Sequence, residues 1–151
     1  MKTLEEAKQH LRENWVKGTK CPCCKQNVKL YKRKMHSVMV RMLIKLYHLG
    51  EGAHHVREIT KGISETGTND FSKLLHWGMI QPVQNVDTSK RTSGYWSITD
   101  RGKMFVNGEL ANVPKYVKIY NGQRIGFSEE KTTIIMALGN KFNYQELMKI
   151  Q

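Results

Sequence analysis

The sequence predicts an α+β fold, and three observations lead to that class. Between residues 37 and 77, apolar side chains recur every three or four positions, which is the spacing of helices that pack on one side. The segments 79–98 and 116–127 instead alternate around turn-forming stretches, as the strands of β-hairpins do. A chain of 151 residues can bury one good core, which favours one compact domain with small additions.

Residues 1–36 are predicted to form an N-terminal helix and a basic segment that contains a cysteine turn. Thr3 and Glu6 have the spacing of a capping box, which opens a helix that runs to about Val16. Cys21 and Cys24 then form a C-P-x-C turn, in which backbone amides point at two thiolates and hold them for zinc. These two cysteines are the candidate metal ligands.

A four-coordinate zinc site needs two further ligands, because no second C-x-x-C follows. They would come from a second chain, from Cys23, or from the histidines at positions 10, 36, 48, 54 and 55. The alternative is a turn with free thiols. Three cysteines within four residues cannot build a disulfide framework, and they indicate a reducing compartment. The first residues lack the apolar stretch of a signal peptide and no apolar run is long enough to span a bilayer, so we expect a cytoplasmic protein.

Residues 37–110 are predicted to contain three helices followed by a hairpin. Ser37 is expected to cap a buried central helix that Gly50 ends, and Val56, Ile59 and Ile63 give the inner face of the second helix.

The third helix, residues 69–77, is predicted to have one packed face and one outward face. Phe71, Leu74 and Leu75 fall at i, i+3 and i+4 and therefore share the packed face. The outward side chains that can contact a partner are Asn69, Lys73 and His76, with Ser72 beside them.

A hairpin with a cationic tip follows the third helix. Gly78 sits where the end of a helix requires a left-handed residue, and an extended segment begins directly after it. The tip, residues 87–94, is polar and contains Lys90 and Arg91. After the returning strand, Thr99 is expected to cap a short closing helix.

This order of parts resembles the winged helix-turn-helix regulators of the MarR and PadR kind. In those proteins the recognition helix ends at a G-L-I-like step and the wing returns into a T-x-x-G motif; here Gly78-Met79-Ile80 and Thr99-Asp100-Arg101-Gly102 hold those places. The resemblance covers residues 37–107 and implies a winged-helix domain with recognition helix 69–77 and wing 87–94. The C-P-x-C element ahead of the stretch from Leu30 to Lys34 also resembles bacteriophage proteins, which implies a phage or prophage origin.

The last segment, residues 111–151, is predicted to add a hairpin and two helices. The Asn121-Gly122 pair between two alternating stretches is the strongest short signal for a hairpin. Ser128 is expected to start a helix that Gly139 stops, and Asn143 is expected to start the final one. Such an extension would cover the core, dimerise the protein or bind a partner.

The net charge of +12 indicates a polyanionic partner. Between residues 14 and 50 the chain has no Asp or Glu, whereas it has many Lys and Arg residues. Nucleic acid is the strongest candidate partner, because phosphate contacts release counterions and supply most sequence-independent affinity. The alternative is a basic surface that only keeps the protein in solution.

We therefore expect a DNA-binding protein, a phage-type transcriptional regulator that uses double-stranded DNA as its partner. The candidate DNA contacts are Asn69, Ser72, Lys73 and His76 on the recognition helix, Lys90 and Arg91 in the wing, and Lys32, Arg33 and Lys34 ahead of the core. A homodimer is compatible with this function. The alternatives from other classes are an RNA-binding factor and an adaptor that binds a host protein.

No catalysis is expected, because the sequence has no paired carboxylates at metal spacing, no nucleophile elbow and no glycine-rich phosphate loop.

Overall fold

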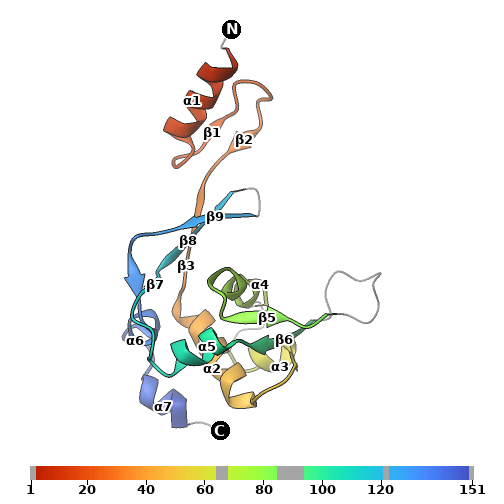
Figure 1. Cartoon of the computed structure of the whole chain (residues 1–151), viewed down its shortest axis with the longest axis vertical. Coiled ribbons are helices and arrows are strands. Elements are labelled where there is room, and N and C mark those ends of the chain that lie inside the picture. The colour runs from red at the N-terminus through yellow and green to blue at the C-terminus, as the bar shows by residue number, and fades with distance from the viewer. Residues whose placement is uncertain (1–2, 64–67, 85–93, 121–122, 150–151) are drawn as a thin grey trace.

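The computed structural model describes residues 3–63, 68–84, 94–120 and 123–149. Within these ranges the protein is a mixed α+β structure, as the sequence predicts, with seven α-helices, one 3-10 helix and four small antiparallel sheets. No helix in the described part is long and apolar enough to cross a membrane. The molecule is elongated: helix α1 (Leu4–Asn14) lies at one end and the C-terminal helices lie at the other (Figure 1).

The N-terminal end is built from α1 and a two-stranded hairpin, β1 (Thr19–Lys20) and β2 (Asn27–Val28). Thr3 is confirmed as the N-cap, because its Oγ1 accepts a hydrogen bond from the backbone N–H of Glu6. The Glu6 carboxylate accepts its bond from the Thr3 hydroxyl, where a capping box would use the Thr3 backbone N–H.

Helix α2 (Ser37–Leu49) is the central helix of the core and buries six of its apolar side chains. The predicted cap at Ser37 is wrong. His36 is the N-cap residue, because its backbone is still extended whereas Ser37 is already helical. The His36 side chain makes no cap bond. Gly50 ends the helix with a φ of 96°, a conformation that L side chains rarely adopt, as the sequence predicts.

Four helical segments and a three-stranded sheet pack around α2. The helical segments are α3 (Val56–Thr60), α4 (Thr68–Ser72), the 3-10 helix η1 (Lys73–Trp77) and α5 (Asp100–Val106). The strands are β4 (His54–His55), β5 (Ile80–Pro82) and β6 (Tyr95–Ile98), in the order β4-β6-β5. Thr99 caps α5 as predicted, since its hydroxyl accepts a hydrogen bond from the N–H of Gly102.

The third helix differs from its prediction in one important respect. It is α-helical only as far as Ser72 and then tightens into η1. A 3-10 helix has three residues per turn, so every third side chain points inward. Phe71, Leu74 and Trp77 are accordingly buried, whereas Leu75 is 44% exposed and does not belong to the packed face. Gly78 ends the helix in the left-handed region, with φ 73° and ψ 20°.

A second three-stranded sheet pairs one strand from the N-terminal part of the chain with two strands from the C-terminal part. Its strands are β3 (Tyr31–Lys34), β8 (Tyr116–Tyr120) and β9 (Gln123–Phe127), in the order β3-β8-β9. β3 comes from the predicted N-terminal segment, whereas β8 and β9 come from the predicted C-terminal one. Figure 1 shows this sheet between the α1 unit and the helical core.

The C-terminal segment also covers the core, but its first helix starts later than expected. Ser128 does not begin a helix; its buried hydroxyl accepts a hydrogen bond from Tyr116 N and donates one to Glu130 O. These bonds hold the backbone extended, so that β10 (Lys131–Thr132) can pair with β7 (Val113–Pro114). The helices that follow are α6 (Ile134–Leu138), which Gly139 stops as predicted, and α7 (Tyr144–Lys149).

Candidate nucleic-acid interface

The predicted recognition face, formed by Asn69, Lys73 and His76, lies on the third helix. Asn69 falls within α4, but its side chain lies outside the described residues. Lys73 and His76 are half-buried and lie three positions apart in η1, which places them on the same side of a 3-10 helix. Burial lowers the pKa of the His76 imidazole, and the positive charges of Lys73 and Arg124 lower it further. These surroundings therefore favour the neutral form of His76.

The C-terminal end of η1 is held by two arginines. Arg101 Nε donates a hydrogen bond of 2.9 Å to the carbonyl oxygen of Trp77, and Arg124 donates one of 2.8 Å to the carbonyl oxygen of His76. Cations at this position stabilise a helix, because the last carbonyl groups have no partner within it. The part of the helix that can meet a partner is therefore its earlier portion, around Ser72, Lys73 and the exposed Leu75.

The predicted wing is described only at its base. Strands β5 and β6 pair antiparallel, with Ile80 opposite Ile98 and Pro82 opposite Trp96. Lys90 and Arg91, the two cations predicted to contact DNA from the tip, lie outside the described residues.

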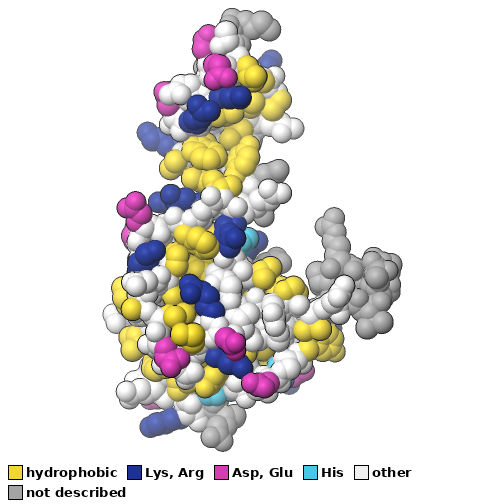
Figure 2. Space-filling view, viewed as in Figure 1, with side chains coloured by type: hydrophobic (Ala, Val, Ile, Leu, Met, Phe, Trp, Pro, Cys, Tyr) yellow, Lys and Arg dark blue, Asp and Glu magenta, His cyan; other side chains and the backbone are white. Residues whose placement is uncertain are grey.

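The sheet β3-β8-β9 brings basic and aromatic side chains onto one surface. Lys32 lies directly opposite Lys118, and Lys34 lies directly opposite Tyr116. Residues opposite each other in an antiparallel pair share a face, as do alternate residues along one strand, so Tyr120 lies on this face too. We call Lys32, Lys34, Tyr116, Lys118 and Tyr120 the basic sheet face. Figure 2 shows Lys and Arg side chains over the part of the molecule where this sheet lies.

Few carboxylates neutralise the basic sheet face. Lys32, Lys34 and Lys118 make no ion pair within the described ranges, whereas the neighbouring Lys115 lies 3.8 Å from a carboxylate oxygen of Glu130. The ammonium group of Lys32 lies 5.8 Å from the centre of the Tyr116 ring, where the ring partly compensates its charge. The face therefore presents positive charge that no described carboxylate neutralises.

Arg33, the remaining basic residue predicted on this strand, lies on the opposite face of the sheet. It is exposed, and its guanidinium lies 5.6 Å from the centre of the Tyr31 ring. The three predicted contacts Lys32, Arg33 and Lys34 thus do not act on one surface, because consecutive residues of a strand alternate between its faces.

Sequence reasoning missed the contribution of β8 to this surface. Tyr116, Lys118 and Tyr120 were recognisable as one side of an alternating strand, and Val117 and Ile119 as its buried side. What the sequence did not show is that β8 pairs with β3, more than eighty positions earlier in the chain.

The cysteine turn has part of the geometry of a zinc-binding turn. Hydrogen bonds from the backbone N–H groups of Cys24 and Cys23 lower the pKa of the Cys21 thiol. The turn closes through Lys25 N–H to Cys21 O at 2.8 Å, and Lys25 has a positive φ of 63°. Donors that stabilise a thiolate also prepare it as a metal ligand.

The turn supplies two of the four ligands that zinc needs. No cluster of three or more His, Cys, Asp or Glu side chains occurs in the described part of the chain. The histidines weighed as further ligands have other partners: His10 bonds Thr19, His36 pairs with Asp70, His48 bonds the carbonyl of Leu147, His54 bonds that of Gly50, and His55 accepts from Arg57. Within the described residues only the cysteine turn offers zinc ligands, so zinc at Cys21 and Cys24 stays a prediction, with free thiols as its alternative.

No known protein family, curated protein or solved structure shows a significant match to this chain. The resemblance to winged-helix regulators and the phage origin therefore stay predictions from the sequence.

Proposed function

We propose that the protein binds nucleic acid, with double-stranded DNA as its preferred partner, and that it acts as a phage-type transcriptional regulator. The order of elements supports a winged helix-turn-helix for this role. Three helical segments, α2, α3 and α4 with η1, precede a β5–β6 hairpin, and β4 pairs with the other edge of β6. In such a domain the third helix meets the major groove and the hairpin is the wing.

The observation that carries the proposal is the pair formed by Lys32 and Lys118. Like charges directly opposite each other destabilise a β-sheet, and no carboxylate of the described residues pairs with either ammonium group. A row of phosphates removes this repulsion and releases its own counterions at the same time. The basic sheet face is thus suited to hold a nucleic-acid backbone.

The two candidate surfaces are linked through the sheet. Because Arg124 of β9 donates to the His76 carbonyl, the sheet is anchored to the C-terminal end of η1. Arg124 lies opposite Ile119, on the face that Lys32 and Lys118 do not share, so the basic sheet face and Lys73 would contact different parts of a nucleic acid. We assign phosphate contacts to Lys32, Lys34 and Lys118, which set affinity and position, and a base contact to Lys73.

A second candidate function is binding of single-stranded RNA or DNA. Tyr116 and Tyr120 lie on either side of Lys118 along β8 and are half-buried, so part of each residue is accessible. Aromatic rings beside cations form platforms on which unpaired bases stack. The tyrosines favour this alternative, whereas the arrangement of the helices and the hairpin favours duplex DNA.

Fluorescence anisotropy with duplex DNA, single-stranded DNA and RNA of the same sequence, measured at several salt concentrations, tests the proposal. Duplex binding should weaken steeply with salt. The double variant Lys32→Met with Lys118→Met should flatten the slope of log K against log salt by about two units, one per lost phosphate contact. The matched control, Lys131→Met with Lys141→Met, removes the same charge from two other exposed positions and should leave the slope close to that of the wild type.

A second arm concerns sequence specificity. After selection of a preferred DNA site, Lys73→Ala should lose about 1–3 kcal/mol of discrimination against random DNA if it contacts a base. Equal salt slopes for the sheet variant and its control would overturn the assignment of the basic sheet face. If the protein binds RNA more tightly than duplex DNA, and Tyr116→Ala abolishes that binding, the second candidate function is established instead. A stoichiometric protein partner that survives nuclease treatment, without DNA binding, would favour an adaptor.

A further inference from the structure

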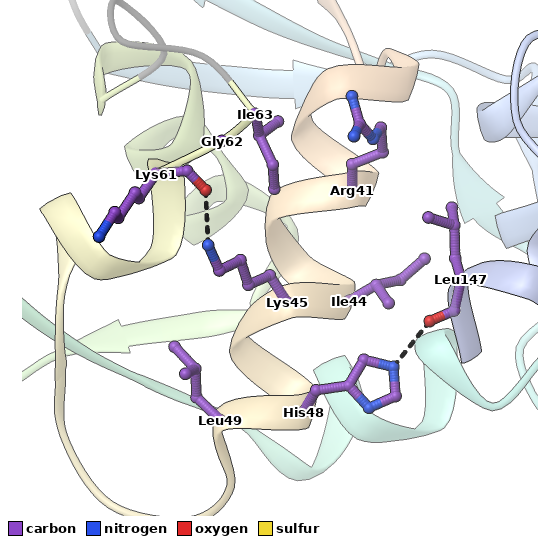
Figure 3. A pocket seen from close by; sticks show the side chains of 9 residues that line it. All are labelled: Arg41, Ile44, Lys45, His48, Leu49, Lys61, Gly62, Ile63 and Leu147. Atoms are coloured by element: carbon purple, nitrogen blue, oxygen red, sulfur yellow. Dashed lines mark hydrogen bonds between the residues drawn. The ribbon is translucent and has the colours of Figure 1, made fainter. Parts of the chain in front are cut away.

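The polar stripe of α2 lines a pocket. Arg41, Lys45 and His48 face a cavity of about 330 Å³ that also borders the loop after α3 and the helix α7 (Figure 3). Its apolar wall includes Ile44, Ile63 and Leu147. The pocket therefore combines cationic and apolar side chains, on a different element from the basic sheet face.

Lys45 and His48 are paired only with neutral groups in this pocket. Lys45 Nζ donates a hydrogen bond to the backbone carbonyl of Lys61, and His48 Nε2 lies 2.9 Å from the carbonyl oxygen of Leu147. None of the described residues that line the pocket is acidic. A carbonyl dipole cannot neutralise an ammonium ion, so the pocket keeps a positive potential.

Arg41 adds a guanidinium group to the lining of the pocket. Its Nε atom is enclosed by protein and makes no hydrogen bond to any described residue. Its guanidinium lies 4.3 Å from the centre of the Phe142 ring. No described acceptor neutralises this group, and a carboxylate is the acceptor that matches a planar guanidinium best.

From these observations we infer that the pocket binds a small organic anion, a monocarboxylate with an apolar body. The carboxylate would accept hydrogen bonds from Arg41 and attract Lys45, while the apolar body would lie against Ile44, Ile63 and Leu147. A cavity of about 330 Å³ is at the lower end of the range of ligand pockets, roughly 300–1,000 Å³, which fits a molecule of eight to ten carbon atoms better than a larger one.

Octanoate and 1-octanol are the probes that test this inference, because they share the apolar chain and differ in the carboxylate. Both are titrated into the full-length protein and followed by NMR backbone shifts. Octanoate should bind and shift the amides of α2, α7 and residues 61–63. 1-Octanol should bind at least about tenfold more weakly, since it lacks the charge-assisted hydrogen bonds.

Three variants separate the pocket from general charge attraction. Lys45→Met should weaken octanoate binding by about tenfold, and Lys45→Arg should keep most of it. Ile63→Trp fills the apolar side and should abolish binding of both probes. Lys20→Met is the matched control, because it removes one exposed cation from β1 at the opposite end of the molecule (Figure 1) and should change nothing.

Thermal melting shows which variants are folded. If Lys45→Met does not fold, the comparison of octanoate with 1-octanol on the wild type decides whether the cations contribute to binding. Equal affinity for octanoate and 1-octanol would overturn the role of the cations. Octanoate shifts outside the pocket, or unchanged octanoate binding in Ile63→Trp, would overturn the site itself. Neither result depends on whether the protein binds nucleic acid.

Discussion

Arg124 ties the C-terminal hairpin to the end of the third helix through its hydrogen bond of 2.8 Å to the carbonyl oxygen of His76. The same guanidinium lies 5.2 Å from the centre of the Phe127 ring, so it contacts Phe127 as well as the His76 carbonyl. The bond gives a helix carbonyl a partner that the helix cannot provide. It also places a positive charge beside the His76 imidazole.

The charge of Arg124 should be visible in the titration of His76. Burial is the largest cause of the lowered pKa of His76, followed by the charges of Lys73 and Arg124. Lys73→Met and Arg124→Met should therefore each raise this pKa towards its ordinary value of 6.5, whereas Lys131→Met should not. NMR titration of the imidazole resonances measures the shift. An unchanged His76 pKa in both variants would contradict the proximity of these charges.

The same lowered pKa predicts a pH dependence of stability. The unfolded chain binds a proton at His76 more readily than the folded protein does, so the folded state loses stability as the pH falls below about 6.5. This loss continues down to the lowered folded pKa. The difference in unfolding free energy between the wild type and His76→Gln should therefore shift against the wild type between pH 7 and pH 5. Urea melts at several pH values measure it, and a difference that is constant across this window would contradict the prediction.

A pair of adjacent leucines tests the 3-10 geometry of η1. Leu74 is fully buried and Leu75 is 44% exposed. Leu74→Ala should destabilise the fold by about 2–5 kcal/mol through lost burial and a residual cavity. Leu75→Ala should cost less than about 1 kcal/mol, because exposed positions seldom contribute more. Chemical denaturation gives both values, and similar losses at the two positions would mean that the helix does not tighten.

Gly102 is required for close packing between α5 and the strand that follows η1. A Cβ atom at this position would lie 2.2 Å from the carbonyl oxygen of Met79 and 2.8 Å from Cγ1 of Ile98. Gly102→Ala should therefore cost about 1–3 kcal/mol or more, as overpacked cores do. Gly126→Ala is the matched control, because an added Cβ there meets nothing within 4 Å. Thermal melting compares them, and equal melting temperatures would contradict this account.

The cysteine turn leads to a prediction about metal and assembly. If Cys21 and Cys24 of two chains complete one tetrahedral site, the purified protein should contain one zinc ion per two chains and lose its dimer in chelator. Cys21→Ser should remove the metal, whereas Cys23→Ser should retain it if Cys23 contributes its backbone N–H to the turn and no ligand to the metal. Elemental analysis with light scattering measures both. A zinc-free protein with unchanged melting in chelator would exclude the site.

Local features of the fold could be predicted from the sequence because their causes are local. The hydroxyl groups of Thr3 and Thr99 cap helices whose N–H groups lie within three residues of them. Gly78 ends a helix because it adopts a positive φ at little cost. The alternation of Tyr116 to Tyr120 predicts a strand with one buried side in the same way.

Features that depend on distant contacts could not be predicted in this way. Ser128 reads as a helix cap, but its hydroxyl bonds to Tyr116 N across a turn of the chain, and the backbone stays extended. Leu75 is expected on the packed face because positions i, i+3 and i+4 share one face of an α-helix. The helix instead tightens into a 3-10 helix, in which Phe71, Leu74 and Trp77 form the packed face.

The sequence by itself determined the α+β class, the helix caps at Thr3 and Thr99, and the excess of positive charge, because each follows from composition or from residues a few positions apart. Only the tertiary structure decided where that charge lies. The pairing of β3 with β8 brings Lys32 opposite Lys118, and the packing of α7 beside α2 closes the pocket around Arg41. Both depend on contacts between segments tens of residues apart, and no local pattern specifies which partner a strand edge or a helix face will take.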